Sequence, residues 1–251
     1  MVEDDLGARV VLAAPPRRVV SLVPSITETV AVSAPGVLVG STDYCTHPAD
    51  LDVPRVGGSK YPDVAAVLAL HPDLVLANQE ENRPQDVQAL RTAGVPVWTT
   101  KAAATVPEAL ESLRRMLVHG VRVAVPPWLP QASAEWADPP PPQRATAIVC
   151  VWRRPWIVLG RDTFAGDVLR RLGIGNAYAH HPERYPRPPL DELHAVHADL
   201  VVLPDEPYAF SAQDGPDAFP DTTCALVSGR HLTWWGPSLL QARAVLAPRL
   251  P

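Results

Sequence analysis

The sequence lacks the features on which several functional classes depend. Its 22 lysines and arginines are outnumbered by 27 aspartates and glutamates, and no basic stripe is present that could neutralise the phosphates of a nucleic acid. No segment reaches the ~18 consecutive apolar residues that a membrane-spanning helix requires. Cysteine is scarce, and Cys45, Cys150 and Cys224 share no metal-site spacing. We therefore expect neither a nucleic-acid partner nor insertion into a membrane.

The chain also lacks the usual start of an exported protein. The first residues, MVEDDLGARVV, carry three acids where a signal peptide carries basic residues, and no apolar segment or lipoprotein motif follows. On this basis we expect a cytoplasmic protein. We further expect a monomer whose partner is a small molecule.

Motifs of nucleophilic catalysis and of phosphate binding are absent as well. There is no Gly-x-Ser-x-Gly, no cysteine and histidine at a family spacing, and no P-loop. The glycines of GVPVW and GGSKY are typical of turns, because a phosphate cradle needs a glycine-rich loop that leads directly into a helix. The sequence thus favours a binding protein over an enzyme. An enzyme that has adapted a binding fold stays open as the alternative.

What the sequence does contain is an internal repeat. Residues 69–80, ALHPDLVLANQE, match residues 195–206, AVHADLVVLPDE, at six positions with the same spacing. Residues 18–24 (RVVSLVP) and 146–152 (TAIVCVW) echo each other at nearly the same offset. Each long copy reads as the end of a helix, a turn, a buried strand and an acidic exit. Two halves built alike imply a cleft between them, where small ligands bind.

Strands and helices alternate along both halves, which is typical of parallel sheets covered on both faces. The pattern predicts an α/β fold with two Rossmann-like lobes. We place the N-terminal lobe at 1–105, a linking helix with a proline-rich connector at 106–143, and the C-terminal lobe at 144–251. Pro126-Pro127 is expected to kink the linking helix.

Local signals predict where the individual elements begin and end. Ser25 and Glu28 form a capping-box pattern at the start of the first helix. Gly94 and Gly173 are expected to end two others. Besides a hairpin over 2–12, strands are predicted at 18–23, 37–41, 73–77, 95–99, 145–152, 199–203 and 223–227, and helices at 26–33, 63–70, 84–93, 163–172, 190–196 and 237–246.

A series of short motifs runs along nearly the whole chain in a fixed order. DDLGARVVLAAPPRRVVSLVPSITETVA comes first, then VGSTDYCTHP, HPDLVLA, GVPVW, GRDTFAGDVLRRLG and ADLVVLPDE. This series resembles the class III periplasmic substrate-binding proteins of cobalamin, siderophore and haem transporters, and most of all the cobalamin-binding branch. The resemblance implies two Rossmann-like lobes joined by one long helix, which lets the lobes move little when a ligand binds.

The resemblance also bears on partners. Exported members dock on a permease through one carboxylate on each lobe, and the equivalent positions here are Ala65 and Asp191. Because Ala65 replaces one of the two acids, we expect permease docking to be impaired.

Ligands of doubly wound α/β lobes bind outside the carboxyl ends of the strands. The residues after the predicted strands include many aromatic rings and few charges. That combination suits a corrinoid such as cobalamin, another metal-tetrapyrrole or a metal chelate, held in the cleft between the lobes. The candidate ligand-binding residues are Tyr44, Tyr61, Trp156, Arg161, Asp205, Tyr208 and Trp235.

Three of these candidates have a second interpretation. Asp205 could instead begin a helix, the commonest use of an acid just before a proline. Arg161 could pair with Asp162 or Asp167 rather than with a ligand. Trp235 competes with Trp234, because adjacent residues of a strand point to opposite faces.

Histidines in predicted loops raise the question of a metal. His47, His180 and His231 are the candidates, and a receptor for Zn or Mn ions is the alternative function that they would support. Against it, His180 and His181 are adjacent and so diverge on a regular backbone, and no His-x-x-x-His occurs. A single histidine could instead serve as an axial ligand to the cobalt or iron of a bound macrocycle.

Overall fold

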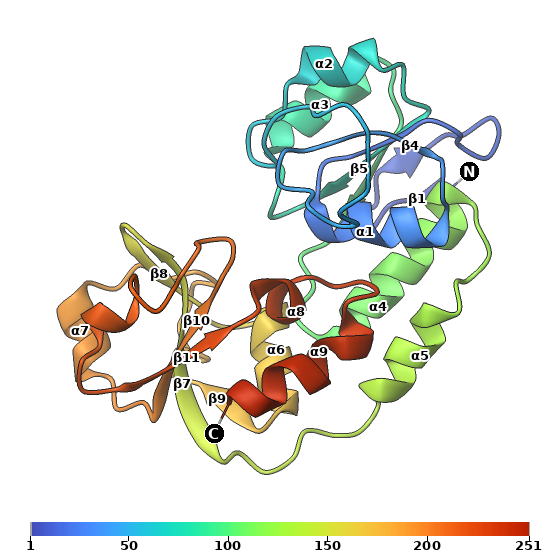
Figure 1. Ribbon diagram of the computed structural model, residues 1–251. Coiled ribbons are helices and arrows are strands. Elements are labelled where there is room, and N and C mark those ends of the chain that lie inside the picture. The colour runs from blue at the N-terminus through green and yellow to red at the C-terminus, as the bar shows by residue number, and fades with distance from the viewer. Residues whose placement is uncertain (1, 251) are drawn as a thin grey trace. The chain divides into compact units, whose positions relative to one another are not determined.

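The computed structural model describes residues 2–250, which divide into two compact units with one parallel sheet each (Figure 1). The predicted α/β class with parallel central sheets is confirmed. Within residues 2–250, no helix combines the length and the apolar character needed to cross a membrane. Unit 1 comprises Met1–Ala102, Leu110–Gln131 and Trp235–Pro237, and unit 2 comprises Ala103–Ala109, Ala132–Trp234 and Ser238–Pro251.

A short hairpin opens unit 1, as predicted. β1 (Val2–Glu3) pairs antiparallel with β2 (Arg9–Val10), and Gly7 takes the positive φ of 78° that the turn requires. The buried carboxylate of Asp4 accepts a hydrogen bond of 2.8 Å from Arg91, which lies on a helix of the same unit. The buried Asp4 thus connects the hairpin to the rest of unit 1.

Four parallel strands form the sheet of unit 1, in the order β4-β3-β5-β6. The central strands β3 and β5 are buried along their whole length, which explains their nearly continuous apolar sequences. Gly94 follows α3 with a positive φ of 83°, as expected for a helix end. The elements are β3 (Val19–Ser21), α1 (Pro24–Ser33), β4 (Leu38–Ser41), α2 (Val64–Ala69), β5 (Leu74–Asn78), α3 (Pro84–Thr92) and β6 (Val97–Thr100).

The start of α1 differs from the prediction. The capping box of Ser25 and Glu28 does not form: the helix begins at Pro24, Val23 is the N-cap, and no side chain caps it. Ser25 and Glu28 lie buried inside the helix instead. Pro24 is compatible with the first helical position because its missing N–H would have had no partner there. The helix therefore starts earlier than the Ser-x-x-Glu pattern suggested.

The parallel strands of unit 2 repeat the topology of unit 1. They lie in the order β9, β7, β10, β11, which corresponds to β4, β3, β5, β6. β8 is an addition that pairs antiparallel with the second half of β7. The short elements β8, β9 and α8 were not predicted. The elements are β7 (Ala145–Arg153), β8 (Trp156–Val158), α6 (Phe164–Arg171), β9 (Ile174–Asn176), α7 (Leu190–Ala195), β10 (Leu200–Pro204), η2 (Pro216–Ala218), β11 (Thr223–Val227), α8 (Gly229–Thr233), α9 (Leu239–Leu246) and η3 (Ala247–Arg249).

The sequence repeat corresponds to a repeated set of hydrogen bonds. In unit 1 the N–H of Asp73 donates to the carbonyl oxygen of Arg18 (2.8 Å), and its carboxylate accepts from the N–H groups of Arg17 (2.9 Å) and Arg18 (3.0 Å). In unit 2 the N–H of Asp199 donates to the carbonyl oxygen of Thr146 (2.8 Å), and its carboxylate accepts from the N–H of Thr146 (2.7 Å). Each aspartate thereby joins the starts of two neighbouring strands.

The predicted linking helix is two helices. α4 (Val106–Arg115) continues into a π-helical turn (Met116–Val121), and α5 (Trp128–Glu135) follows after a break. The break begins before Pro126-Pro127, since Arg122 already has a left-handed φ of 61°. The paired prolines then keep the intervening chain out of helical conformation, because they lack N–H donors and push the residue before them toward extended backbone.

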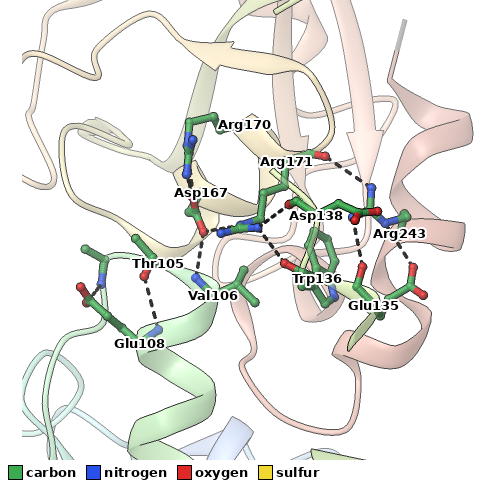
Figure 2. Close-up of polar contacts among 11 residues, drawn as sticks. Thr105, Val106, Glu108, Glu135, Trp136, Asp138, Asp167, Arg170, Arg171 and Arg243 are labelled. Carbon is green, nitrogen blue, oxygen red and sulfur yellow. Dashed lines mark hydrogen bonds and ion pairs between the residues drawn. The ribbon is translucent and has the colours of Figure 1, made fainter. Parts of the chain in front are cut away.

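A group of hydrogen bonds and ion pairs around the buried Asp167 of unit 2 connects the N-terminus of α4 to α6 (Figure 2). Asp167 accepts hydrogen bonds from the N–H of Val106 (2.9 Å) and from Arg171 (2.8 Å), and Arg170 pairs with its other oxygen. Arg171 also donates to the carbonyl oxygen of Trp136 (2.7 Å). Burial raises the pKa of Asp167, but the hydrogen bonds from Arg171, Val106 and Arg170 outweigh it and hold the pKa below its ordinary value.

Candidate functional site

The loop that follows β4 in unit 1 is shaped by Arg55. Its guanidinium donates to the hydroxyl of Ser41 (2.7 Å) and to the carbonyl oxygens of Thr42 (3.1 Å) and Cys45 (2.9 Å). Tyr44, a predicted ligand residue, lies within this loop and is 66% exposed. The loop backbone is therefore fixed while the aromatic ring stays accessible.

Tyr61 is a second accessible ring in unit 1, with 68% of the residue exposed. The guanidinium carbon of Arg83 lies 4.4 Å from the ring centroid, a cation–π contact. The same guanidinium pairs with Asp86 (2.7 Å), and this hydrogen bond raises the pKa of Arg83. Arg83 covers one part of the ring and restrains it, so Tyr61 can present its remaining surface in a defined orientation.

Two asparagines tie the carboxyl ends of the strands of unit 1 together. Asn78 at the end of β5 donates to the hydroxyl of Thr100 at the end of β6 (3.0 Å), and its N–H donates to Oδ1 of Asn82 (2.8 Å). Asn82 in turn donates to the carbonyl oxygens of Leu22 (3.2 Å) and Ser59 (2.8 Å). These groups are neutral and buried. Asn82 is not among the predicted ligand residues, because a lone asparagine in a loop carries no distinctive signal.

Aromatic rings gather at the corresponding end of the sheet in unit 2. Trp156 on β8 stacks on Phe210 (centroids 6.1 Å apart, planes at 7°) and meets Phe219 edge-on (5.3 Å, 67°). Tyr208 contacts Phe210 (4.6 Å) and meets Trp152 edge-on (5.3 Å, 77°). Contacts with Phe210 and Phe219 thus cover much of the ring of Trp156. Trp152, which is 39% exposed, is the accessible ring of the group.

Trp152 was not among the predicted ligand residues. It is the last residue of the apolar strand predicted at 145–152. The register of the β7–β8 pair shifts between Cys150 and Trp152, so the simple alternation of the strand is interrupted there. A bulge of this kind re-aims the side chains beyond it, and the sequence does not mark its position.

Arg153, next to Trp152, joins two acids of unit 2. Its guanidinium forms ion pairs with Asp214 and with Asp217 (2.5 Å), and the hydroxyl of Tyr208 also donates to Asp214. The hydrogen bond from Arg153 lowers the pKa of Asp217, and the reciprocal interaction raises the pKa of Arg153. We refer to this group as the Arg153 cluster, which consists of Trp152, Arg153, Tyr208, Asp214 and Asp217.

Asp205 lines a cavity of about 320 Å³ in unit 2. Its carboxylate accepts a hydrogen bond from the N–H of Gly229 (2.6 Å), so it contacts the first residue of α8 instead of beginning a helix of its own. The volume lies near the lower end of the range for small-molecule pockets, about 300–1,000 Å³. The lining residues come from the end of β10 and the loop after it, from the end of β11, and from α9 and η3: Leu203, Asp205, Phe210, Leu226, Val227, Ser228, Val245 and Arg249.

The remaining predicted ligand residues are less accessible or already engaged. Arg161 pairs with Asp162 (2.7 Å), one of the alternatives that the sequence left open. Trp235 is only 8% exposed, and Trp234 is buried too. Neither tryptophan lies in a strand, since both follow the end of α8, so strand alternation does not apply to them. Gly236 packs so closely on α1 that a Cβ there would lie 2.6 Å from the hydroxyl oxygen of Thr29.

The candidate histidines contact hydroxyl groups or solvent. Nδ1 of His47 lies 3.0 Å from the hydroxyl of Thr46, and Nδ1 of His231 lies 2.8 Å from the hydroxyl of Ser228. His180 is exposed. Across residues 2–250, no three histidine, cysteine, aspartate or glutamate side chains come together in a group that could hold a metal ion.

The architecture is that of the class III substrate-binding proteins, and the resemblance read from the sequence is confirmed. The periplasmic vitamin B12-binding protein BtuF of Vibrio cholerae matches with a TM-score of 0.73 and 19% identity, over 94% of this chain and 97% of that chain. The periplasmic haem-binding protein RhuT from Roseiflexus sp. RS-1 gives 0.77 and 21%, over 93% and 97%. A periplasmic haem-binding protein from Pseudomonas aeruginosa gives 0.73 and 25%, over 94% and 93%.

A sequence relative points to the same class of protein. An uncharacterised ABC transporter substrate-binding lipoprotein of Bacillus subtilis strain 168, YvrC, is 30% identical over 115 residues. The match covers 45% of this chain and 37% of YvrC, so it spans less than half of the relative's length. No protein-family model matches the chain.

The expected cytoplasmic location is wrong. YvrC is named a lipoprotein, and BtuF and RhuT are named periplasmic, which points to a location outside the cytoplasm. Two of the three acidic residues that suggested otherwise serve the fold: Asp4 pairs with Arg91 (2.8 Å) and Asp5 pairs with Arg115 (2.7 Å). These ion pairs account for the charges of Asp4 and Asp5, which therefore do not indicate where the protein is located.

Proposed function

We propose that the protein binds a corrinoid, or another tetrapyrrole or metal chelate, as the extracytoplasmic substrate-binding component of an ABC uptake system. The observation that carries this proposal is the set of accessible aromatic rings at the carboxyl ends of the strands, Tyr44 and Tyr61 in unit 1 and Trp152 in unit 2. Ligands of parallel α/β sheets bind at these ends, and flat rings suit a flat macrocycle. The names of BtuF and RhuT support the same ligand class.

The surroundings of these rings suit a receptor. In unit 1, Arg55 holds the backbone around Tyr44, and Arg83 restrains Tyr61. In unit 2, Tyr208 packs against Trp152. A surface that is ordered before the ligand arrives loses less entropy on binding. The acids of the Arg153 cluster are paired with Arg153, which makes them poor candidates for proton transfer and favours binding over catalysis.

Calorimetric titration of the full chain with cyanocobalamin, haem and a ferric siderophore tests the proposal. We expect at least one of them to bind, and Trp152→Ala to weaken that binding by about 1–3 kcal/mol, the scale of one buried aromatic side chain. Leu6→Ala, which truncates an exposed apolar residue of the β1–β2 turn, is the matched control and should leave the affinity unchanged.

Two outcomes would contradict the proposal. Binding of a macrocycle with equal affinity to the wild type and to Trp152→Ala would remove the aromatic surface of unit 2 from the site. If no chelate binds but free Zn²⁺ or Mn²⁺ binds saturably, the metal-ion receptor is favoured instead.

We further propose that contact with a permease depends more on unit 2 than on unit 1. Ala65 is the second residue of α2 and Asp191 the second residue of α7, and both are exposed, so the two positions are structurally equivalent. Only Asp191 can pair with a basic residue of a permease. In the native host, Asp191→Asn should lower uptake of radiolabelled ligand and Ala65→Asp should raise it. Equal uptake by both variants and the wild type would rule out this asymmetry.

A further inference from the structure

We infer that the protein selects among macrocycles by charge, and that the Arg153 cluster favours corrinoids over porphyrins with free propionates. The inference rests on the proposed function, since it names the preferred member of that ligand class. Corrinoids carry neutral amide side chains around the ring, whereas haem carries two carboxylates. The question is therefore which of these substituents the groups beside Trp152 can accept.

The guanidinium of the cluster is already occupied. One terminal nitrogen of Arg153 pairs with Asp214 and the other with Asp217 (2.5 Å), and the side chain of Arg153 is only 14% exposed. The second oxygen of Asp214 accepts the hydroxyl of Tyr208, and the second oxygen of Asp217 accepts the N–H of Gly215 (2.8 Å). A propionate that approaches Arg153 would meet a largely buried guanidinium whose charge is already neutralised by two acids that other groups hold in place.

The acids, in contrast, extend to the surface, and Tyr208 connects Asp214 to Trp152. The side chains of Asp214 and Asp217 are 36% and 54% exposed. Ionised carboxylates accept hydrogen bonds and cannot donate them, so they suit the N–H donors of amides. Two carboxylates against one guanidinium leave the cluster with excess negative charge, which repels the propionates of haem.

Parallel titrations of the full chain with cyanocobalamin and haem measure this selectivity. We expect cyanocobalamin to bind at least about tenfold more tightly. Because added salt screens repulsion between like charges, the affinity for haem should rise between low and high ionic strength. A haem affinity that falls with salt would indicate attraction to a cation and would contradict the inference.

Asp217→Asn tests the cluster directly. The change removes one carboxylate and releases one arm of Arg153, so the ratio of haem affinity to cyanocobalamin affinity should rise by about tenfold. Asp221→Asn is the matched control, because it removes the same charge from an exposed acid of unit 2 and leaves the pairs of Arg153 intact. Its ratio should equal that of the wild type.

Arg154 is the competing explanation and has its own variant. It is exposed and lies in the turn between β7 and β8, next to Arg153. Arg154→Gln should not change the ratio. A selective loss of haem binding in this variant would assign propionate recognition to Arg154 and overturn the inference.

The possible failures are distinguishable. If neither macrocycle binds, the proposed function fails. If both bind and haem binds as tightly as cyanocobalamin, or if Asp217→Asn and Asp221→Asn give the same ratio, the proposed function stands and charge selection is refuted.

Discussion

The two units share one strand order, but the residues at the carboxyl ends of their strands differ in chemistry. In unit 1 the carboxyl ends of the strands are joined by neutral amides and hydroxyls centred on Asn78 and Asn82. In unit 2 the same end of the sheet carries stacked aromatic rings and the Arg153 cluster. A topology used twice therefore does not impose the same surface twice. The apolar strands determine the fold, and the loops and added elements at their carboxyl ends determine the chemistry of the candidate site.

The added strand β8 accounts for much of the difference. β7 extends past the parallel sheet and turns back as β8, and this hairpin supplies Trp152, Arg153 and Trp156. β3, the equivalent strand of unit 1, ends at Ser21 and leads directly into α1. Unit 2 thus gains a chemically distinct surface without altering the order of its parallel strands.

Removing the charge of Asp167 tests how far the stability of unit 2 depends on its buried ion pairs. In Asp167→Asn the buried guanidinium of Arg171 loses its counter-ion, so we expect a loss of about 3–5 kcal/mol in the free energy of unfolding, the cost of leaving a buried charge unpaired. Urea unfolding followed by circular dichroism measures this loss. Asp162→Asn, which removes an exposed partner of Arg161, is the control and should cost less than about 1 kcal/mol.

The same acid predicts a pH dependence. Because the folded pKa of Asp167 lies below its ordinary value, its contribution to stability is complete above an unfolded pKa of about 3.9 and is lost as the pH falls through the folded pKa. The stability difference between the wild type and Asp167→Asn should therefore shrink under acid. A difference that stays constant from neutral pH to strong acid would show that the ionised carboxylate of Asp167 does not stabilise the folded state.

A smaller effect separates the two copies of the repeat. Asp73→Ala removes hydrogen bonds to two backbone N–H groups, while Asp199→Ala removes one. Hydrogen bonds to charged groups are worth about 1.5–3 kcal/mol each, and solvent exposure places these near the low end. We expect Asp73→Ala to be the more destabilising of the pair in the same urea assay. The reverse order would show that the number of backbone hydrogen bonds does not set the contribution of each aspartate.

The sequence predicted the fold because the fold depends on strong local patterns. Apolar runs marked the central strands, and the matching aspartates at 73 and 199 marked equivalent turns. The capping-box prediction at Ser25 failed for a related reason: two start signals compete at that point, and Pro24 fixes the helix start before Ser25 can cap it. Such patterns act over a few residues, where sequence reasoning is strongest.

The candidate site was predictable only in part, because its geometry depends on contacts between distant residues. Tyr44 and Tyr61 could be named from their positions after strands, and they are accessible. Trp152 lies at a register shift of the β7–β8 pair, and the pairing of Arg153 with Asp214 and Asp217 spans 61 and 64 residues. Neither feature leaves a local mark in the sequence.

The smallest expected effect tests whether the two units differ in polarity beneath their surfaces. Cys45 in unit 1 is buried, with its Sγ 3.0 Å from the hydroxyl of Thr27 and 3.1 Å from that of Thr42. Cys150 in unit 2 lies in an apolar cluster with Val158, and burial raises the pKa of its thiol. The two thiols are equally inaccessible but have opposite surroundings.

Serine replacements should therefore separate the two positions. Cys45→Ser places a hydroxyl beside two others that can exchange hydrogen bonds with it, so its cost should stay within about 0.5 kcal/mol. Cys150→Ser buries a hydroxyl among apolar side chains, and the unmet hydrogen bond should cost about 1–3 kcal/mol. Alanine at each position controls for the lost sulfur volume, and chemical unfolding reports all four variants. If serine is no worse than alanine at Cys150, or is as damaging at Cys45 as at Cys150, the contrast between a polar and an apolar interior does not hold at these two sites.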